Sequence, residues 1–91
     1  MKQTSISELR KKIDRVDNRI VNLIHERMAL IVTIGRMKKM SSKPIYNRQR
    51  EKEVINNWLD QAAKHGLDRK IINSIARLII RASIIKQKNN E

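Results

Sequence analysis

A regular spacing of apolar residues dominates the first 40 residues of the chain. Apolar side chains recur there in alternating steps of three and four, at Ile6, Leu9, Ile13, Val16, Ile20, Leu23, Leu30, Ile34 and Met37. This heptad spacing predicts one long amphipathic helix whose apolar seam packs along a partner helix. One position of the seam is occupied by Arg27, and a guanidinium buried there requires an anionic partner.

Polar residues at the start of this pattern and a proline after it bound the first helix. Ser5 or Ser7 is expected to cap it, and Glu8 is placed to complete a capping box from Ser5. We expect the helix over about residues 6–39, because the segment that leads to Pro44 breaks the pattern. At ~1.5 Å per residue such a helix is roughly 50 Å long.

Two shorter helices are predicted in the remainder of the chain. Asn47 is expected to cap a helix over about residues 47–64, and Gly66 suits the position after its C-terminus. Asp68 is expected to cap a third helix, over about residues 68–87. The sequence therefore predicts an all-α fold in one domain over residues 1–91.

The two shorter helices cannot cover the whole seam of the first helix. Monomeric proteins rarely expose a large contiguous apolar patch, so an uncovered stripe of isoleucine and leucine is expected to be an interface. We therefore expect an obligate homodimer in which the long helices share one core.

The composition supports the predicted all-α fold. The 91 residues include two glycines and one proline but no cysteine, which disfavours a β-sandwich and excludes disulfides, thiolate nucleophiles and cysteine-based metal sites. The first residues lack the apolar stretch of a signal peptide. The longest apolar run, residues 75–85, contains Arg77 and Arg81 and is too short to span a bilayer. We expect a cytoplasmic protein.

The charge balance predicts an anionic partner. Twenty-one lysines and arginines against nine acidic residues give a formal net charge of +12. Nucleic acid, an acidic membrane surface or a small polyanionic substrate would satisfy this bias, and composition alone favours nucleic acid.

Cations on the long helix raise a geometric question. Lys38 lies on nearly the same face as Arg27, whereas Arg10 is roughly 42 Å from Lys38 along the axis. An antiparallel crossing of two subunits near Ile20 would bring Arg10 beside the partner's Arg27 and Lys38. A parallel pairing, which isoleucine at a and leucine at d mildly favour, would bring Arg10 only against itself.

Further polar residues lie on or beside the apolar faces of the shorter helices, at Asn47, Arg50, Glu51, Ser83 and Gln87. Each has a structural interpretation. A single charged heptad residue often sets the register or snorkels, Ser83 could bond to its own helix, and Gln87 could be solvated near a helix end. Because all of them can converge near one end of the bundle, we interpret them together as a site.

Several short segments occur at a characteristic joint spacing. They are Leu9-Arg10-Lys11-Lys12-Ile13-Asp14, Asp17-Asn18-Arg19-Ile20, His25-Glu26-Arg27, Lys38, Pro44-Ile45, Arg50-Glu51-Lys52-Glu53 and Ser83 through Gln87. No single segment is specific, but in their joint spacing the chain resembles the all-helical, type II class of chorismate mutase over nearly its full length. The resemblance implies an intertwined helical homodimer of three-helix subunits, in agreement with the exposed seam.

The resemblance also implies a reaction and its main residues. Chorismate rearranges to prephenate in a unimolecular [3,3] step of phenylalanine and tyrosine biosynthesis, which needs no nucleophile, metal or other cofactor. The resemblance assigns Arg27 and the other subunit's Arg10 to the substrate carboxylates, because a guanidinium group can bind a carboxylate through two hydrogen bonds. Lys38 would contact the ether oxygen and one carboxylate, and Gln87 would donate its amide N–H to the same ether oxygen.

The remaining residues would bind the ring end of the substrate or a carboxylate. Glu51 and Asn47 would bind the ring hydroxyl, Arg50 would support that end, and Ser83 would help to hold a carboxylate. Asn47 stands where many members of the class have aspartate, so the site has one negative charge fewer. Its amide oxygen can still accept a hydrogen bond.

Other functions compete with this one. An isochorismate-pyruvate lyase uses the same helical dimer, although the presence of Arg50, Glu51 and Ser83 favours the mutase. A basic helical dimer that binds nucleic acid is disfavoured by the scattered cations and the lack of aromatic residues for base stacking. An adaptor dimer would leave Arg27 unexplained. We expect no nucleic-acid or membrane partner, and the sequence leaves open whether another enzyme of the aromatic pathway activates the dimer.

Overall fold

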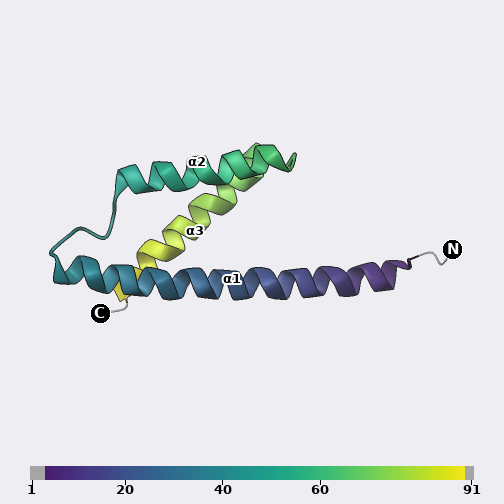
Figure 1. Ribbon diagram of the computed structural model, residues 1–91, viewed down its shortest axis with the longest axis horizontal. Coiled ribbons are helices and arrows are strands. Elements are labelled where there is room, and N and C mark those ends of the chain that lie inside the picture. Colours follow the sequence, from purple (N-terminus) through teal and green to yellow (C-terminus); the bar gives the residue numbers. More distant parts are fainter. Residues whose placement is uncertain (1–3, 90–91) are drawn as a thin grey trace. The chain divides into compact units, whose positions relative to one another are not determined.

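The structure of the chain is a computed structural model that describes residues 4–89. Within this range it contains three helices and no strand, namely α1 (Ile6–Met40), α2 (Arg48–Lys64) and α3 (Arg69–Asn89) (Figure 1). The expected all-α class with one very long first helix is therefore confirmed. No helix of the described range is long and apolar enough to cross a membrane.

The helix bounds lie within two residues of the expected ones. The largest difference is at the end of α3, which continues to Asn89 instead of ending at about residue 87. Lys86 and Lys88 lie in its last turn, where positive charge interacts favourably with the C-terminal end of the helix dipole.

The chain divides into two compact units, and the boundary between them in the sequence lies after Leu30. The first unit is the helical segment up to Leu30. The second begins at Ile31 and comprises the last turns of α1, together with α2 and α3. The interpretation of residues 1–91 as a single domain stays a prediction.

Along its whole length α1 buries no residue. Its N-terminus is capped as expected, since the amide N–H of Glu8 donates to Ser5 Oγ at 3.1 Å. The seam residues are exposed in the single chain, among them Ile6, Leu9, Ile13, Val16, Ile20, Leu23, Leu30, Ile34 and Met37. The apolar stripe predicted from the sequence is thus an open surface of the single chain.

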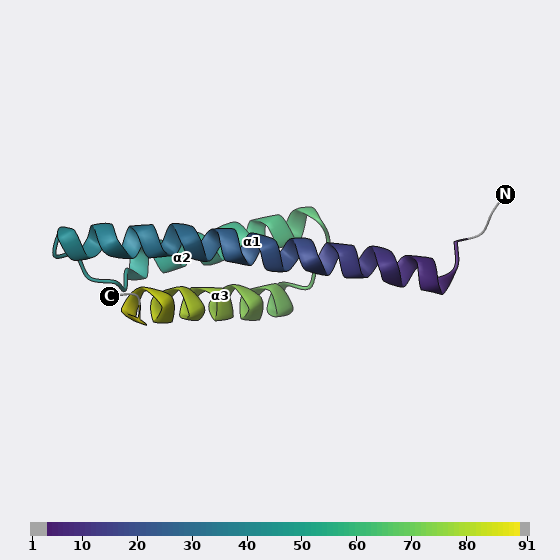
Figure 2. The ribbon, with the colours of Figure 1, turned by 90° about the horizontal axis from the view of Figure 1, so that it is seen from below.

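In the second unit, α2 and α3 form an antiparallel helical pair (Figure 1). Ala62 of α2 and Ala76 of α3 are the buried apolar residues of the described chain, and their small side chains allow two helices to approach closely. Both views place the C-terminal part of α3 beside the last turns of α1 (Figures 1 and 2). The expected cap of α3 is present, because the Ile71 amide donates to Asp68 Oδ1 at 2.9 Å.

Two helices end in the same hydrogen-bonding pattern, the Schellman motif. After α2, the Leu67 amide donates to the Ala62 carbonyl at 2.9 Å, and Gly66 adopts a φ of 64°, as predicted for a glycine at this position. After α1, the Lys43 amide donates to the Lys38 carbonyl at 2.8 Å, and the corresponding position is Ser42 with a φ of 54°. A non-glycine residue in this left-handed region is strained, and no sequence signal marked it.

This strain makes Ser42→Gly a stabilising substitution. Glycine removes the steric cost of the left-handed conformation, which is about 1 kcal/mol. Ser41→Gly is the matched control. It raises the chain entropy of the unfolded state as much as Ser42→Gly does, but the φ of Ser41 is not positive. In urea denaturation at equal protein concentration, Ser42→Gly should be about 1 kcal/mol more stable than Ser41→Gly. Equal stabilities would contradict the Schellman geometry.

Candidate active site

The eight residues expected in the site are divided between the two units of the chain. Arg10 and Arg27 belong to the first unit, where Arg10 is exposed and Arg27 is half-buried. The other six all belong to the second unit: Lys38, Asn47, Arg50, Glu51, Ser83 and Gln87. Two of them make contacts between helices there, Glu51 with Arg77 of α3 and Gln87 with Gly35 of α1.

Lys38 ties the last turn of α1 to the segment that leads into α2. Its Nζ donates to the Ile45 carbonyl at 2.7 Å, and its own carbonyl accepts the Schellman hydrogen bond from Lys43. The side chain is half-buried. An ammonium group has three donors, so a lysine held by one carbonyl can still donate to a ligand.

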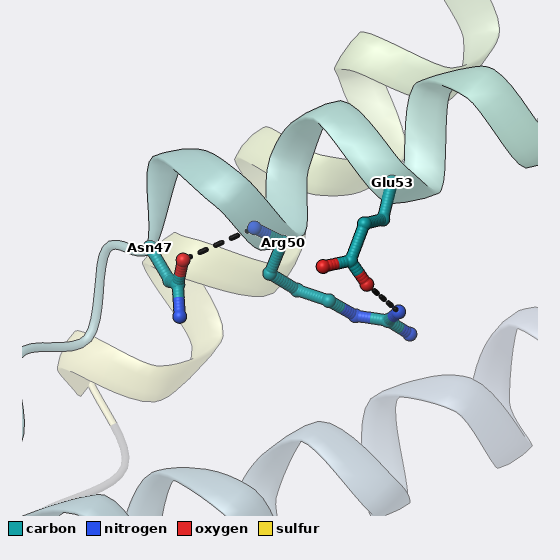
Figure 3. A network of polar contacts seen from close by, with 3 residues as sticks. All are labelled: Asn47, Arg50 and Glu53. Atoms are coloured by element: carbon teal, nitrogen blue, oxygen red, sulfur yellow. Dashed lines mark hydrogen bonds and ion pairs between the residues drawn. The ribbon is translucent and has the colours of Figure 1, made fainter.

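Asn47 and Arg50 lie at the first turn of α2 (Figure 3). Asn47 caps the helix as predicted, with Oδ1 accepting from the Arg50 amide at 3.0 Å and its amide nitrogen directed away. The Arg50 Nη1 lies 3.3 Å from Glu53 Oε2. Both side chains are more than half exposed, so this ion pair contributes little to stability and leaves the guanidinium accessible.

Glu51 has two neighbours that the sequence did not identify as site residues. Arg77 of α3 reaches it with Nη1 3.9 Å from Glu51 Oε1. The pKa of the exposed Tyr46 is raised, first by a hydrogen bond with Glu51 and then by slight desolvation and the negative charge of Glu51, against a lowering by Arg48. The tyrosine hydroxyl is the donor of this hydrogen bond and the Glu51 carboxylate is the acceptor. The signals available were weak: Tyr46 is the only tyrosine, and Arg77 interrupts an apolar run.

Ser83 and Gln87 are the two buried polar residues of the described chain. Ser83 Oγ donates to the Ile79 carbonyl at 2.8 Å, so the structural interpretation of this serine, a bond to its own helix, holds. Gln87 is only 9% exposed, which shows that its interpretation as a solvated residue near a helix end is wrong.

The amide of Gln87 is incompletely hydrogen-bonded. Its Nε2 makes a long contact of 3.4 Å to the Ser83 carbonyl, and its buried Oε1 has no hydrogen-bond partner in the described chain. An unpaired buried polar atom costs about 1–3 kcal/mol, so Gln87 lowers the stability of the single chain.

The stem of Gln87 lies directly against Gly35 of α1. A Cβ at residue 35 would lie 3.1 Å from Gln87 Cγ and 3.4 Å from its Cβ. Sequence reasoning missed this contact, although a signal was present: a glycine inside a helix costs roughly 1 kcal/mol relative to alanine and often marks a close approach.

Two hollows flank α3. One of about 540 Å³ lies at the end of α1 and is lined by Gly35, Arg36, Lys39, Met40, Lys43, Ile45 and Gln87. The other, of about 780 Å³, is lined by Glu51, Ser74, Arg77, Leu78, Ile80, Arg81, Ile84, Ile85 and Lys88. Both contain several cations, which attract anionic ligands. Among residues 4–89, no group of three acidic or histidine side chains is arranged to hold a metal ion.

Comparisons with known proteins connect this geometry to one family. The family model described as chorismate mutase type II matches residues 9–88. A chorismate mutase of Methanocaldococcus jannaschii is 32% identical over 83 residues, which cover 91% of this chain and 84% of the relative. A bifunctional chorismate mutase/prephenate dehydratase of Escherichia coli strain K12 is 31% identical over 80 residues, 88% of this chain and 21% of that protein.

A second bifunctional chorismate mutase/prephenate dehydratase, from Aquifex aeolicus, is 41% identical over 54 residues, 59% of this chain and 15% of the relative. The chain thus spans about a fifth or less of the length of these bifunctional relatives. It matches the archaeal protein over most of its length.

The unpaired amide predicts that Gln87 reduces stability. Gln87→Met keeps the size of the side chain and removes the unsatisfied Oε1, so the free energy of unfolding should rise by about 1 kcal/mol. Gln61→Met, the same exchange at an exposed position of α2, is the matched control and should change it by less than about 0.5 kcal/mol. Urea denaturation at one protein concentration measures both. A loss of stability in Gln87→Met would mean that the Gln87 amide is satisfied.

Proposed function

Because this chain belongs to the chorismate mutase type II family, we propose that it is a chorismate mutase, an isomerase that converts chorismate to prephenate. The family match covers all eight residues that the sequence points to, from Arg10 to Gln87. The structural observation that carries the proposal is the buried amide of Gln87, which lies between α3 and α1 and whose Nε2 makes a single long hydrogen bond within the described chain.

The reaction needs positioning and electrostatic stabilisation and no covalent chemistry from the protein. Within one molecule the ether C–O bond breaks as a new C–C bond forms, so no proton, electron pair or leaving group is exchanged with the enzyme. Holding the flexible side chain over the ring lowers the entropic part of the barrier. Donors directed at the ether oxygen stabilise the negative charge that develops there, at about 2.7–4 kcal/mol for each donor.

Gln87 suits this second task. A primary amide has two N–H donors, and the long bond to the Ser83 carbonyl uses only one of them. Burial strengthens a hydrogen bond made by the remaining N–H, because the local dielectric constant is low. In our proposal this N–H donates to the ether oxygen in the transition state.

The cations provide the recognition of the substrate carboxylates. We assign Arg27 and the other subunit's Arg10 to the two carboxylates, in the bidentate geometry that guanidinium groups favour. Lys38 contacts one carboxylate and the ether oxygen. Its present bond to the Ile45 carbonyl uses one of its three donors and fixes the position of the ammonium group.

The ring hydroxyl is assigned to the start of α2. Asn47 Oδ1 already accepts from the Arg50 amide, and its second lone pair can accept the hydroxyl proton. Glu51, with Arg77 and Tyr46 as neighbours, offers a second acceptor, and the accessible Arg50 supports this end. Ser83 must turn its hydroxyl away from the Ile79 carbonyl before it can donate to a carboxylate.

The proposal includes an obligate homodimer. The seam of α1 is exposed, and the described chain buries only two apolar side chains, Ala62 and Ala76. So small an apolar core cannot offset the conformational entropy lost on folding. A second copy that covers the seam supplies the missing burial, and the resemblance implies that it also supplies Arg10.

The bifunctional relatives join a chorismate mutase to a prephenate dehydratase. We propose by analogy that the product of this chain passes to a prephenate-consuming enzyme in phenylalanine and tyrosine biosynthesis. A cytoplasmic location and an activating partner from the same pathway stay predictions.

The first test is the reaction itself. Chorismate should disappear with formation of prephenate in an ultraviolet assay with product identification, and isochorismate run in parallel should give no pyruvate. Gln87→Met is the control that attributes activity to this site, and its kcat should fall by about 10²-fold or more. Pyruvate from isochorismate alone would favour the lyase, and retention of nucleic acid without turnover of either substrate would favour the nucleic-acid-binding dimer.

Complementation tests the contribution of Arg10 across the interface. Arg10→Ala and Lys38→Ala homodimers should each be nearly inactive, because every site in either lacks a cation. After the two are unfolded and refolded together, a mixed dimer has one intact site and one site with both lesions. Random pairing should then restore about a quarter of the wild-type activity, as two-fold symmetry requires.

Two controls accompany the mixing experiment. Each variant refolded alone should stay inactive, and Lys11→Ala, at an exposed residue beside Arg10, should remain active. If mass analysis shows mixed dimers but no activity returns, Arg10 does not act across the interface. The antiparallel crossing near Ile20 would then be wrong.

A further inference from the structure

Gly35 occupies a position where glycine is unfavourable for the helix itself. It lies inside α1, five residues before the helix ends at Met40, and it is half-buried. Glycine in a helix interior is less stable than alanine, because it loses more backbone entropy on folding. Its φ is not in the left-handed region, in contrast to that of Gly66. Backbone conformation therefore does not explain this glycine.

The space around Gly35 does explain it. The three heavy atoms nearest to a Cβ at this position would all belong to Gln87: Cγ at 3.1 Å, Cβ at 3.4 Å and Cα at 3.6 Å. Carbon atoms pack best at about 3.5–4.0 Å, so a methyl group at residue 35 would push the Gln87 stem away by a few tenths of an ångström. Gly66, by comparison, has open space at the corresponding position.

We propose that Gly35 is a positioning residue for the Gln87 amide. This inference rests on the proposed function, in which that amide donates to the ether oxygen of chorismate. The absent side chain lets the Gln87 stem lie on α1, and Lys38 projects from the same helix three residues later. One short segment of α1 thereby sets the position of both donors to the ether oxygen.

The consequence for catalysis follows from the distance range of hydrogen bonds. A donor stabilises the developing charge only when it lies about 2.7–3.1 Å from the oxygen. Displacement of Cγ moves the amide at the end of the side chain, which is 9% exposed and lies at the edge of the hollow at the end of α1. The interaction lost is one made in the transition state, so kcat falls while KM stays nearly unchanged.

A double-mutant cycle separates positioning from packing. The four proteins are the wild type, Gly35→Ala, Gln87→Ala and the double variant, with kcat and KM measured for the conversion of chorismate to prephenate. Gly35→Ala should lower kcat severalfold with KM within about twofold, since a misplacement of ~1 Å can cost about 10²-fold and the shift here is a few tenths of an ångström. In the Gln87→Ala background the same change should leave the residual kcat unaltered, because alanine retains only the Cβ, at 3.4 Å.

Folding is measured in parallel by circular dichroism and urea denaturation. Gly35→Ala is expected to fold, since alanine favours the helix. If it does not fold but the double variant does, the clash with Gln87 is demonstrated directly. If neither folds, Gly35 is required for packing and the inference is wrong.

The kinetic outcomes distinguish this inference from the proposed function. A wild-type protein without mutase activity would overturn the proposed function. An active wild type with an equally active Gly35→Ala would overturn the inference alone. An equal loss of kcat in both backgrounds would also overturn it, because the effect of residue 35 would then not pass through Gln87.

Discussion

An apolar seam that the chain cannot cover by itself is the constraint on which the rest of the structure depends. The seam extends along α1, a helix of 35 residues, and none of its residues is buried in the single chain. The second unit offers little compensation, because its buried apolar residues are two alanines. In our proposal a second subunit covers the seam, and the same contact completes the site with Arg10. Folding and substrate recognition would then depend on one interface.

Helix ends position most of the polar groups in the second unit. Lys38 is held by a Schellman motif through its carbonyl and by the Ile45 carbonyl through its ammonium group. Asn47 caps α2, and its Oδ1 accepts a hydrogen bond from the backbone N–H of Arg50. The side chains of Lys38 and Asn47 are anchored by hydrogen bonds to backbone groups, which fix their directions more firmly than the exposed ion pair with Glu53 fixes the Arg50 guanidinium. Preorganisation of this kind is what a reaction without covalent catalysis requires.

Several residues have a structural role beside the one we propose in catalysis. Asn47 caps a helix, and Ser83 bonds to the preceding turn. For these two, the local interactions alone would account for the residue type. Gln87 differs, because its burial and its unpaired Oε1 are unfavourable for the folded chain. Gly35 differs in the same sense, since it weakens α1 and allows Gln87 to lie against it. Groups that reduce stability are the stronger indication of function.

The sequence by itself determined the three helices, because the apolar periodicity and the caps Ser5, Asn47 and Asp68 are local signals. It also indicated the family, through the joint spacing of short segments that the family model matches over residues 9–88.

Only the tertiary structure decided which polar groups meet. It paired Glu51 with Arg77, buried Gln87 and gave a reason for Gly35, because each of these contacts joins residues far apart in the chain. It also revealed the left-handed conformation of Ser42. A serine does not indicate this conformation in a sequence, whereas a glycine such as Gly66 after α2 does. Periodicity specifies the face of a helix on which a residue lies, whereas the partner of that face depends on how the helices pack.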